Sequence, residues 1–318
     1  MQKTNFTKFA IVFLVLAIAL QACNKFKDYF PHGGGNNNKK TIAQIVAGDP
    51  DFSLLKKALV KADLVSTLDK PGTYTVFAPN DAAFKAAGFD DAAIDAASAD
   101  VLKPILLYHV LGSKITASQI PVADNTPVAT VNGKDIYVTS KDNNVSVNGG
   151  HVIKADIMAS NGVVHAIDKV LVPPSGNIVE LAQGNPNLTY LVAAVVRAST
   201  GTTNVAALLT GDGPLTVFAP TNQAFIDAGF PTNESINAAS PDALTPILAY
   251  HVIAARVFSA NLVDGSTPAT VNGETVTIQL SGGAAVKGKS NSSASNINPA
   301  DLVATNGVVH VIDQVLLP

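Results

Sequence analysis

The sequence Thr75-Val76-Phe77-Ala78-Pro79-Asn80 decides the fold, because it returns 141 residues later as Thr216-Val217-Phe218-Ala219-Pro220-Thr221. A short apolar stretch closed by proline is typical of a buried strand, since proline has no N–H to continue the ladder. The residue after each proline is one that favours the N-cap of a helix. A repeat of this period is too long for a solenoid unit and suits a whole domain. We therefore expect two copies of one domain.

Three further motifs recur in the same order. They are residues 102–110 with 244–252, 130–133 with 270–273, and 161–165 with 306–310. Between the copies stands Pro173-Pro174-Ser175-Gly176, a short hinge that keeps neighbouring domains close. The sequence therefore predicts one domain over 41–173 and a second over 176–318, in contact with each other.

Each copy combines helical and strand patterns. Apolar residues at helical spacing predict helices over 52–64 and 187–198. Asn132-Gly133 and Asn148-Gly149 lie between alternating segments and predict two hairpins, and a last strand is expected over 163–172. Because helices come first and strands cluster late, the predicted class is α+β rather than alternating βαβ.

The composition agrees with folded domains and excludes several classes of protein. The 318 residues are 47% hydrophobic and 14% charged, which is incompatible with an intrinsically disordered chain. A formal net charge of −3 offers no basic surface, so no nucleic-acid partner is expected. The chain has one cysteine, which leaves no disulfide within it.

The N-terminal segment indicates export. Lys3 and Lys8 precede an apolar run over 9–20, which is too short for a hydrocarbon core of roughly 30 Å and is typical of a signal peptide. Cys23, the single cysteine, follows directly on Leu20-Gln21-Ala22, and this pattern resembles a bacterial lipobox. A plain signal peptide with an incidental cysteine is the alternative.

We therefore predict a lipoprotein signal peptide over 1–22, lipidation of Cys23, and a flexible Gly/Asn-rich tether over 23–40. Attached acyl chains would anchor the protein to a membrane. Asn24 is not the aspartate that retains many lipoproteins in the inner membrane, which favours the outer membrane of a Gram-negative bacterium. The expected location is thus the cell envelope.

The repeated motifs resemble those of the fasciclin domain family. The similarity rests on T-V-F-A-P-x-x-x-A-F, on a central Tyr-His pair, and on N-G-V-V-H-x-I-D-x-V-L, each present in both copies. One departure is that the usual Thr-Asp after the proline is Asn80-Asp81 in one copy and Thr221-Asn222 in the other; both can cap a helix. The resemblance implies a β-wedge or sandwich of about seven strands with a helical layer in each domain. It also implies extracellular adhesion and no shared catalytic activity.

Tyr108, His109, Tyr250 and His251 are the candidate partner-binding residues, because the tyrosine of this motif is linked to receptor contact in some members of the family. A histidine that titrates near neutral pH could also act as a general base. However, no serine, cysteine or carboxylate recurs beside either histidine as a nucleophile would. A buried histidine that is hydrogen-bonded between two layers is the favoured interpretation of both.

The remaining candidates predict neither a metal site nor a cofactor. Period two places His165 and His310 on a mostly buried strand face, and no zinc-binding spacing is present. Asp168 and Asp313 supply one carboxylate per copy, too few for calcium, and are expected to bind backbone groups. The Ser/Asn-rich segment 287–298 is either a solvated loop or a contact surface.

The sequence thus predicts a non-catalytic adhesion lipoprotein that binds an extracellular or cell-surface protein or glycan and reaches the membrane through its lipid anchor. Two alternatives remain open. One is an envelope protein that captures glycans for an uptake system, although six tyrosines and no tryptophan provide few stacking platforms. The other is a hydrolase, for which the nucleophile is missing.

Overall fold

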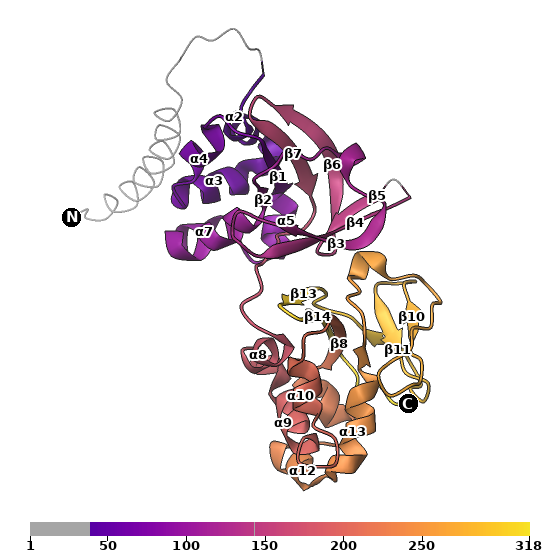
Figure 1. The fold of residues 1–318 in the computed structure, drawn as a ribbon. Helices are drawn as coiled ribbons and strands as arrows, with labels where there is room; N and C mark the ends of the chain where they lie inside the picture. The colour runs from indigo at the N-terminus through magenta and orange to yellow at the C-terminus, as the bar shows by residue number, and fades with distance from the viewer. Residues whose placement is uncertain (1–38, 143) are drawn as a thin grey trace, which may run out of the picture.

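The computed structural model describes residues 39–142 and 144–318, which form two α+β domains in succession (Figure 1). The predicted signal peptide, Cys23 and nearly all of the tether lie outside these residues. Within the described ranges, no helix has the length and apolar character needed to cross a membrane.

The helices of domain 1 lie on one side of its sheet (Figure 1). They are α2 (Ile42–Gly48), α3 (Ser53–Lys61), α4 (Val65–Asp69), α5 (Asp81–Ala86), α6 (Asp91–Ala96) and α7 (Ala99–Tyr108). The predicted helix over 52–64 is α3, which ends early because Asp63 adopts a left-handed backbone with φ of 55°. Asn80 caps α5 as predicted, accepting a 2.8 Å hydrogen bond from the Ala83 N–H.

Seven strands of domain 1 form one sheet in the order β2-β1-β7-β6-β5-β4-β3. They are β1 (Tyr74–Pro79), β2 (Val110–Leu111), β3 (Ala123–Ala129), β4 (Asp135–Lys141), β5 (Asn144–Val147), β6 (Gly150–Ala159) and β7 (Gly162–Ile167). Strands β1 and β7 are parallel, and the other paired strands are antiparallel. Both predicted hairpin turns are present, β3 to β4 and β5 to β6. Strand β7 ends before 172, because beyond it the Leu171 N–H donates to His109 instead of a strand.

Domain 2 repeats this order with the sheet divided. Its helices are α8 (Ile178–Gln183), α9 (Thr189–Ala198), α10 (Val205–Thr210), α11 (Asn222–Asp227), α12 (Asn233–Ala238) and α13 (Pro241–Tyr250). Its strands are β8 (Leu215–Pro220), β9 (Val252–Ile253), β10 (Thr277–Gln279), β11 (Ala285–Lys287), β12 (Ser295–Asn296), β13 (Leu302–Ala304) and β14 (Gly307–Ile312). A four-stranded sheet β13-β14-β8-β9 and a three-stranded sheet β10-β11-β12 are linked by a bridge between Ile297 and Ile312. The seven strands and the helical layer predicted for each domain are confirmed.

Each domain has two apolar clusters, one on either face of its parallel strand pair. In β1, Val76 and Ala78 belong to the cluster under the helices, whereas Phe77 belongs to the cluster inside the wedge. This alternation follows from the period of two along a strand. Tyr108 and Tyr250 lie in the wedge clusters of domains 1 and 2. The Tyr-His pairs thus stand where the last helix of each layer meets the sheet.

Candidate functional site

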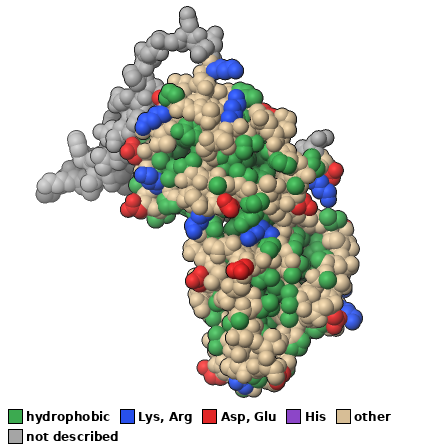
Figure 2. Space-filling view, in the orientation of Figure 1, with side chains coloured by type: hydrophobic (Ala, Val, Ile, Leu, Met, Phe, Trp, Pro, Cys, Tyr) green, Lys and Arg blue, Asp and Glu red, His purple; other side chains and the backbone are tan. Residues whose placement is uncertain are grey.

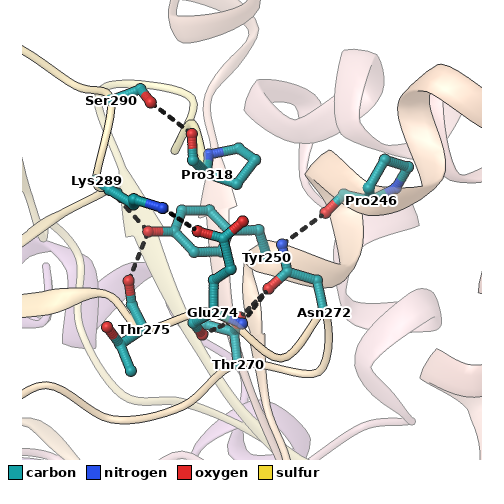
Figure 3. A network of polar contacts seen from close by, with 9 residues as sticks. All are labelled: Pro246, Tyr250, Thr270, Asn272, Glu274, Thr275, Lys289, Ser290 and Pro318. Carbon is teal, nitrogen blue, oxygen red and sulfur yellow. Dashed lines mark hydrogen bonds and ion pairs between the residues drawn. The ribbon is translucent and has the colours of Figure 1, made fainter.

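The two tyrosines of the Tyr-His pairs are fully buried, each with its hydroxyl between two segments. The Tyr108 hydroxyl donates to the Asp135 carbonyl (2.7 Å) and accepts from Asn148 Nδ2 (3.0 Å). Burial raises the pKa of Tyr108 to about 12. The Tyr250 hydroxyl donates to the Thr275 carbonyl (2.7 Å) and accepts from the Lys289 N–H (3.0 Å), as Figure 3 shows. Each tyrosine therefore fixes a turn of the wedge.

The two histidines connect the last helix of the layer to the chain beyond the last strand. His109 Nδ1 lies 2.8 Å from the Ile105 carbonyl, and Nε2 accepts from the Leu171 N–H (2.9 Å). His251 repeats both contacts, with the Ile247 carbonyl (2.8 Å) and the Leu316 N–H (2.9 Å). These partners require a neutral imidazole with its proton on Nδ1. Burial lowers the pKa of both histidines to about 4, so both are neutral at pH 7.

The second pair of repeated histidines is buried in the same way. His165 Nε2 lies 2.9 Å from the Ile115 carbonyl, and His310 Nε2 lies 2.8 Å from the Val257 carbonyl. Each ring also stacks on the phenylalanine of the strand beside it, at 5.5 Å for Phe77 and 5.7 Å for Phe218 between ring centroids. All four histidines therefore serve packing and backbone satisfaction.

The repeated aspartates bind backbone N–H groups. Asp168 Oδ1 accepts from the His151 N–H (2.7 Å), and Asp313 Oδ1 accepts from the Asn296 N–H (2.8 Å). Across the described ranges, no group of three or more His, Cys, Asp or Glu side chains is placed to hold a metal ion.

A direct contact between Tyr108, His109, Tyr250 or His251 and a partner would need exposed side chains, and these four are at most 2% exposed. The structure assigns them a positioning role instead. His109 holds Leu171 and Tyr108 holds Asn148, and both of those residues line a cleft between the domains. The Tyr-His pair is thus buried beneath this surface and fixes two of the residues that form it.

Domain 2 covers this surface of domain 1. The Arg256 guanidinium lies 3.9 Å from the centroid of the Tyr137 ring, and its Nη1 donates to the Gly307 carbonyl (2.6 Å). Asn125 Nδ2 donates to the Arg256 carbonyl (2.6 Å). Burial lowers the pKa of Arg256, while Tyr137 and Tyr108 oppose the loss of its charge. The guanidinium is therefore held by an aromatic face and main-chain carbonyls. The domains touch, as the short hinge predicts.

Two more polar contacts complete the junction. Lys169 Nζ lies 2.7 Å from Asp301 Oδ2, and the Asp301 carboxylate also accepts from the Ser259 N–H (2.6 Å). Asn261 Nδ2 donates to Thr139 Oγ1 (3.1 Å). Figure 2 shows charged side chains near the waist between the domains. A cleft of about 630 Å³ and a second of about 400 Å³ flank these contacts.

Sequence reasoning missed the junction residues, although the repeat contains a signal for them. Register with the repeated motifs places Thr277, Gln279 and Gln314 of domain 2 where domain 1 has Tyr137, Thr139 and Lys169. These three positions at the junction are therefore ones at which the two copies differ.

Within residues 39–142 and 144–318, the matching surface of domain 2 contacts no second domain. We call it the open face and define it by Thr277, Gln279, Lys289, Gln314 and Leu317. The chain end that contributes to it lies on the side of domain 2 away from domain 1 (Figure 1). Lys289 and Glu274 form an exposed ion pair at its edge, with a distance of 3.0 Å (Figure 3).

Part of the Ser/Asn-rich segment 287–298 packs beside the open face. Ser290 N–H donates to the Leu317 carbonyl (3.1 Å), and Asn291 bonds the N–H of Leu317 (2.8 Å) and the carbonyl of Val315 (2.9 Å). The corresponding residues of domain 1, Val170 to Val172, line the larger inter-domain cleft. Segment 287–298 therefore packs on residues of domain 2 whose equivalents in domain 1 line the inter-domain cleft.

Comparison with known proteins gives a consistent result. The family model of the fasciclin domain matches residues 50–173 and again 186–318. Protein sll1483 of Synechocystis is 38% identical over 173 residues, which cover 54% of this chain and 94% of that protein. The transforming growth factor-beta-induced protein ig-h3 of Sus scrofa is 30% identical over 79% of this chain, but this chain spans only 35% of its length.

Two further proteins are similar over part or most of the chain. The cell surface glycolipoprotein MPB83 of Mycobacterium bovis is 32% identical over 166 residues, covering 49% of this chain and 72% of that protein. A solved structure of a FAS1 domain pair from the insect cell adhesion molecule fasciclin I is 20% identical with a TM-score of 0.41, covering 87% of this chain and 96% of the other.

Proposed function

The chain belongs to the fasciclin domain family, whose members are known in cell adhesion proteins, and we propose that it is a non-catalytic binding protein of the cell surface. Its partner is an extracellular or cell-surface protein or glycan. The contact is made through the open face of domain 2. A shared fold does not by itself identify a binding surface. The support comes from a difference between the two domains of this chain.

The observation that carries the proposal is the different use of one surface in the two domains. In domain 1 this surface binds domain 2 through Tyr137 and Lys169. In domain 2 it is scaffolded by the same Tyr-His contacts; Lys289 and Leu317 are exposed there, and Thr277, Gln279 and Gln314 are half-buried. Rigid scaffolds that present exposed loops commonly carry binding, and the equivalent surface of domain 1 holds a neighbouring domain, although through different side chains.

The test is an array of matrix proteins, cell-surface proteins and glycans probed with residues 24–318. We expect retention on one class of partner, which also separates a protein from a glycan. Lys289→Glu, at the edge of the open face, should weaken that retention at least about tenfold, the effect of about 1.4 kcal/mol. Lys103→Glu, on the exposed side of α7, is the matched charge reversal and should bind as the native chain does. Equal retention of both variants would contradict the open face as the binding surface.

We further propose that the protein is anchored to the cell envelope, in the outer membrane of a Gram-negative bacterium, by lipid on Cys23. Support comes from the lipobox-like Leu20-Gln21-Ala22-Cys23 and from the similarity to a protein named as a cell surface glycolipoprotein. Mass spectrometry of the membrane-derived protein should find acyl chains on Cys23, and Cys23→Ser should move the protein to the soluble fraction. Undiminished recovery of the variant with membranes would remove the anchor.

A further inference from the structure

Domain 2 contains an apolar pocket of about 130 Å³ under its helical layer. Helices α8, α9 and α10 form its sides, and Val217, Leu248, His251 and Val252 form its far wall. His251 adds no free polar atom there, because both ring nitrogens are bonded to backbone. The other polar side chain of the lining, Gln183, belongs to α8 and is exposed. The interior of the pocket is therefore apolar.

The repeat shows which residues open the pocket. Two matched contacts fix the register: Asn161 bonds the Ile42 N–H and the Leu68 carbonyl, and Asn306 bonds the Ile178 N–H and the Leu209 carbonyl. In this register three buried residues of domain 1 become smaller in domain 2. Val46 is replaced by Ala182, Leu59 by Val195 and Val65 by Ala206.

All three replacements line the pocket. Val46, Leu59 and Val65 are in the core of domain 1, where their additional carbon atoms fill the space between α2, α3 and α4. Two lining positions are larger in domain 2, Val179 for Ala43 and Gln183 for Ala47. Val179 is half-buried and Gln183 is exposed, so the added atoms lie toward the outside. A neighbouring pocket of domain 1, about 80 Å³, opens instead beside Tyr74 and Val131.

The entrance has also changed character. Val192 stands in domain 2 where domain 1 has Lys56, and Val196 beside it is 59% exposed. An uncharged entrance, apolar except for Gln183, leads to an apolar interior and fits an uncharged ligand. A dry apolar cavity of about 150 Å³ is known to bind benzene or xenon, so a pocket of this volume takes a group of that size.

We propose that domain 2 binds a small uncharged apolar molecule, such as a single aromatic ring or a branched alkyl compound, between α8, α9 and α10. The site is separate from the open face, and the inference does not depend on the proposed function. An unfilled cavity lowers the stability of a domain. Three replacements by smaller residues nevertheless meet at this one place and keep the cavity open.

Benzene and xenon are the probes, applied to residues 24–318 and followed by methyl NMR and thermal unfolding. We expect saturable shifts of methyl groups of Val195, Leu209 and Val217 with benzene, and a benzene-dependent rise in the unfolding midpoint of domain 2. Ala182→Val restores the residue of domain 1. It should abolish the benzene shifts and raise the midpoint without ligand. Ala206→Val provides a second, independent filling variant with the same expectation.

The matched control is Val46→Ala in domain 1, which should lower the midpoint of that domain and leave benzene binding by domain 2 intact. Absence of saturable benzene binding to the native chain would overturn the proposal. So would unchanged shifts in both filling variants, because the probe would then bind elsewhere. If the native chain takes up no benzene but Ala182→Val loses array binding, the pocket receives a side chain of the partner and the small-molecule site is wrong.

Discussion

The surfaces around Tyr108 and Tyr250 are built alike but face different neighbours. In both, a buried tyrosine holds a turn and a neutral histidine holds the segment after the last strand. The surface near Tyr108 faces domain 2, whereas the surface near Tyr250 faces solvent and a segment of its own domain. The buried contacts are the same in both domains and are therefore required by the fold. The neighbours of the two surfaces differ and are specific to each domain.

The largest expected effect tests whether the two histidines are equivalent. His109→Ala and His251→Ala should each lower the free energy of unfolding of their own domain by about 3 kcal/mol, from a small cavity and an unpaired backbone N–H and carbonyl. Urea unfolding of each variant measures this loss. His151→Ala, at an exposed position, is the control and should change little. A loss confined to one domain would break the equivalence.

Acid should act on both domains through the same groups. An unfolded histidine takes up its proton near pH 6.5, whereas the buried imidazoles of His109 and His251 have a pKa of about 4. The unfolded state therefore binds more protons between these values, and stability falls as the pH decreases from about 6.5 to about 4. At pH 5 each histidine should account for a loss of about 2 kcal/mol. Burial likewise lowers the pKa of His310, which adds to the loss. Unfolding free energies that stay constant from pH 7 to pH 5 would contradict neutral, buried rings.

Replacing the tyrosines should reveal how the two turns differ. Tyr108→Phe and Tyr250→Phe should each lower the unfolding free energy by about 1.5 kcal/mol, because a carbonyl and a donor lose their partner. In domain 2 the donor is the Lys289 N–H, so hydrogen exchange at that amide should accelerate. In domain 1 the donor is the Asn148 side chain, so the amide at the position equivalent to Lys289, that of Gly150, should be unaffected. Faster exchange at both amides would mean that the turns are held alike.

The smallest expected change in stability concerns the junction. Lys169→Met leaves the buried Asp301 carboxylate with Ser259 alone, but Lys169 is partly exposed, so the cost should be below about 1 kcal/mol. The relative orientation of the domains, measured by small-angle X-ray scattering, should nevertheless broaden. Gln314→Met, at the equivalent position of domain 2, should leave scattering unchanged. The same scattering curve for native and Lys169→Met protein would show that this pair does not fix the orientation.

Much of the fold follows from the sequence because its determinants are local and occur twice. The Asn-Gly turns, the cap at Asn80 and the proline-closed strand each depend on a few consecutive residues. The end of β7 could not be predicted, since it depends on His109, which is 62 residues from Leu171 along the chain. The favoured interpretation of the histidines as buried and bonded is confirmed. Their apolar neighbours were sufficient to indicate it.

The junction and the pocket could not be predicted from the sequence, for a different reason. Arg256 and Tyr137 lie in different domains, and neither belongs to a repeated motif. Ala182 and Val195 are ordinary core residues and Ala206 is half-buried, and they form a pocket only because three helices bring them together. Alignment of the two copies contains the signal, but reading it requires knowing which positions meet in space.

The way Arg256 is held has a consequence for the conditions that the protein can tolerate. Its charge faces a ring and main-chain carbonyls, and main-chain carbonyls do not titrate. Salt screens the attraction between solvent-exposed ions, but a desolvated cation against an aromatic face is screened much less. The two domains should consequently keep their arrangement from fresh water to brine.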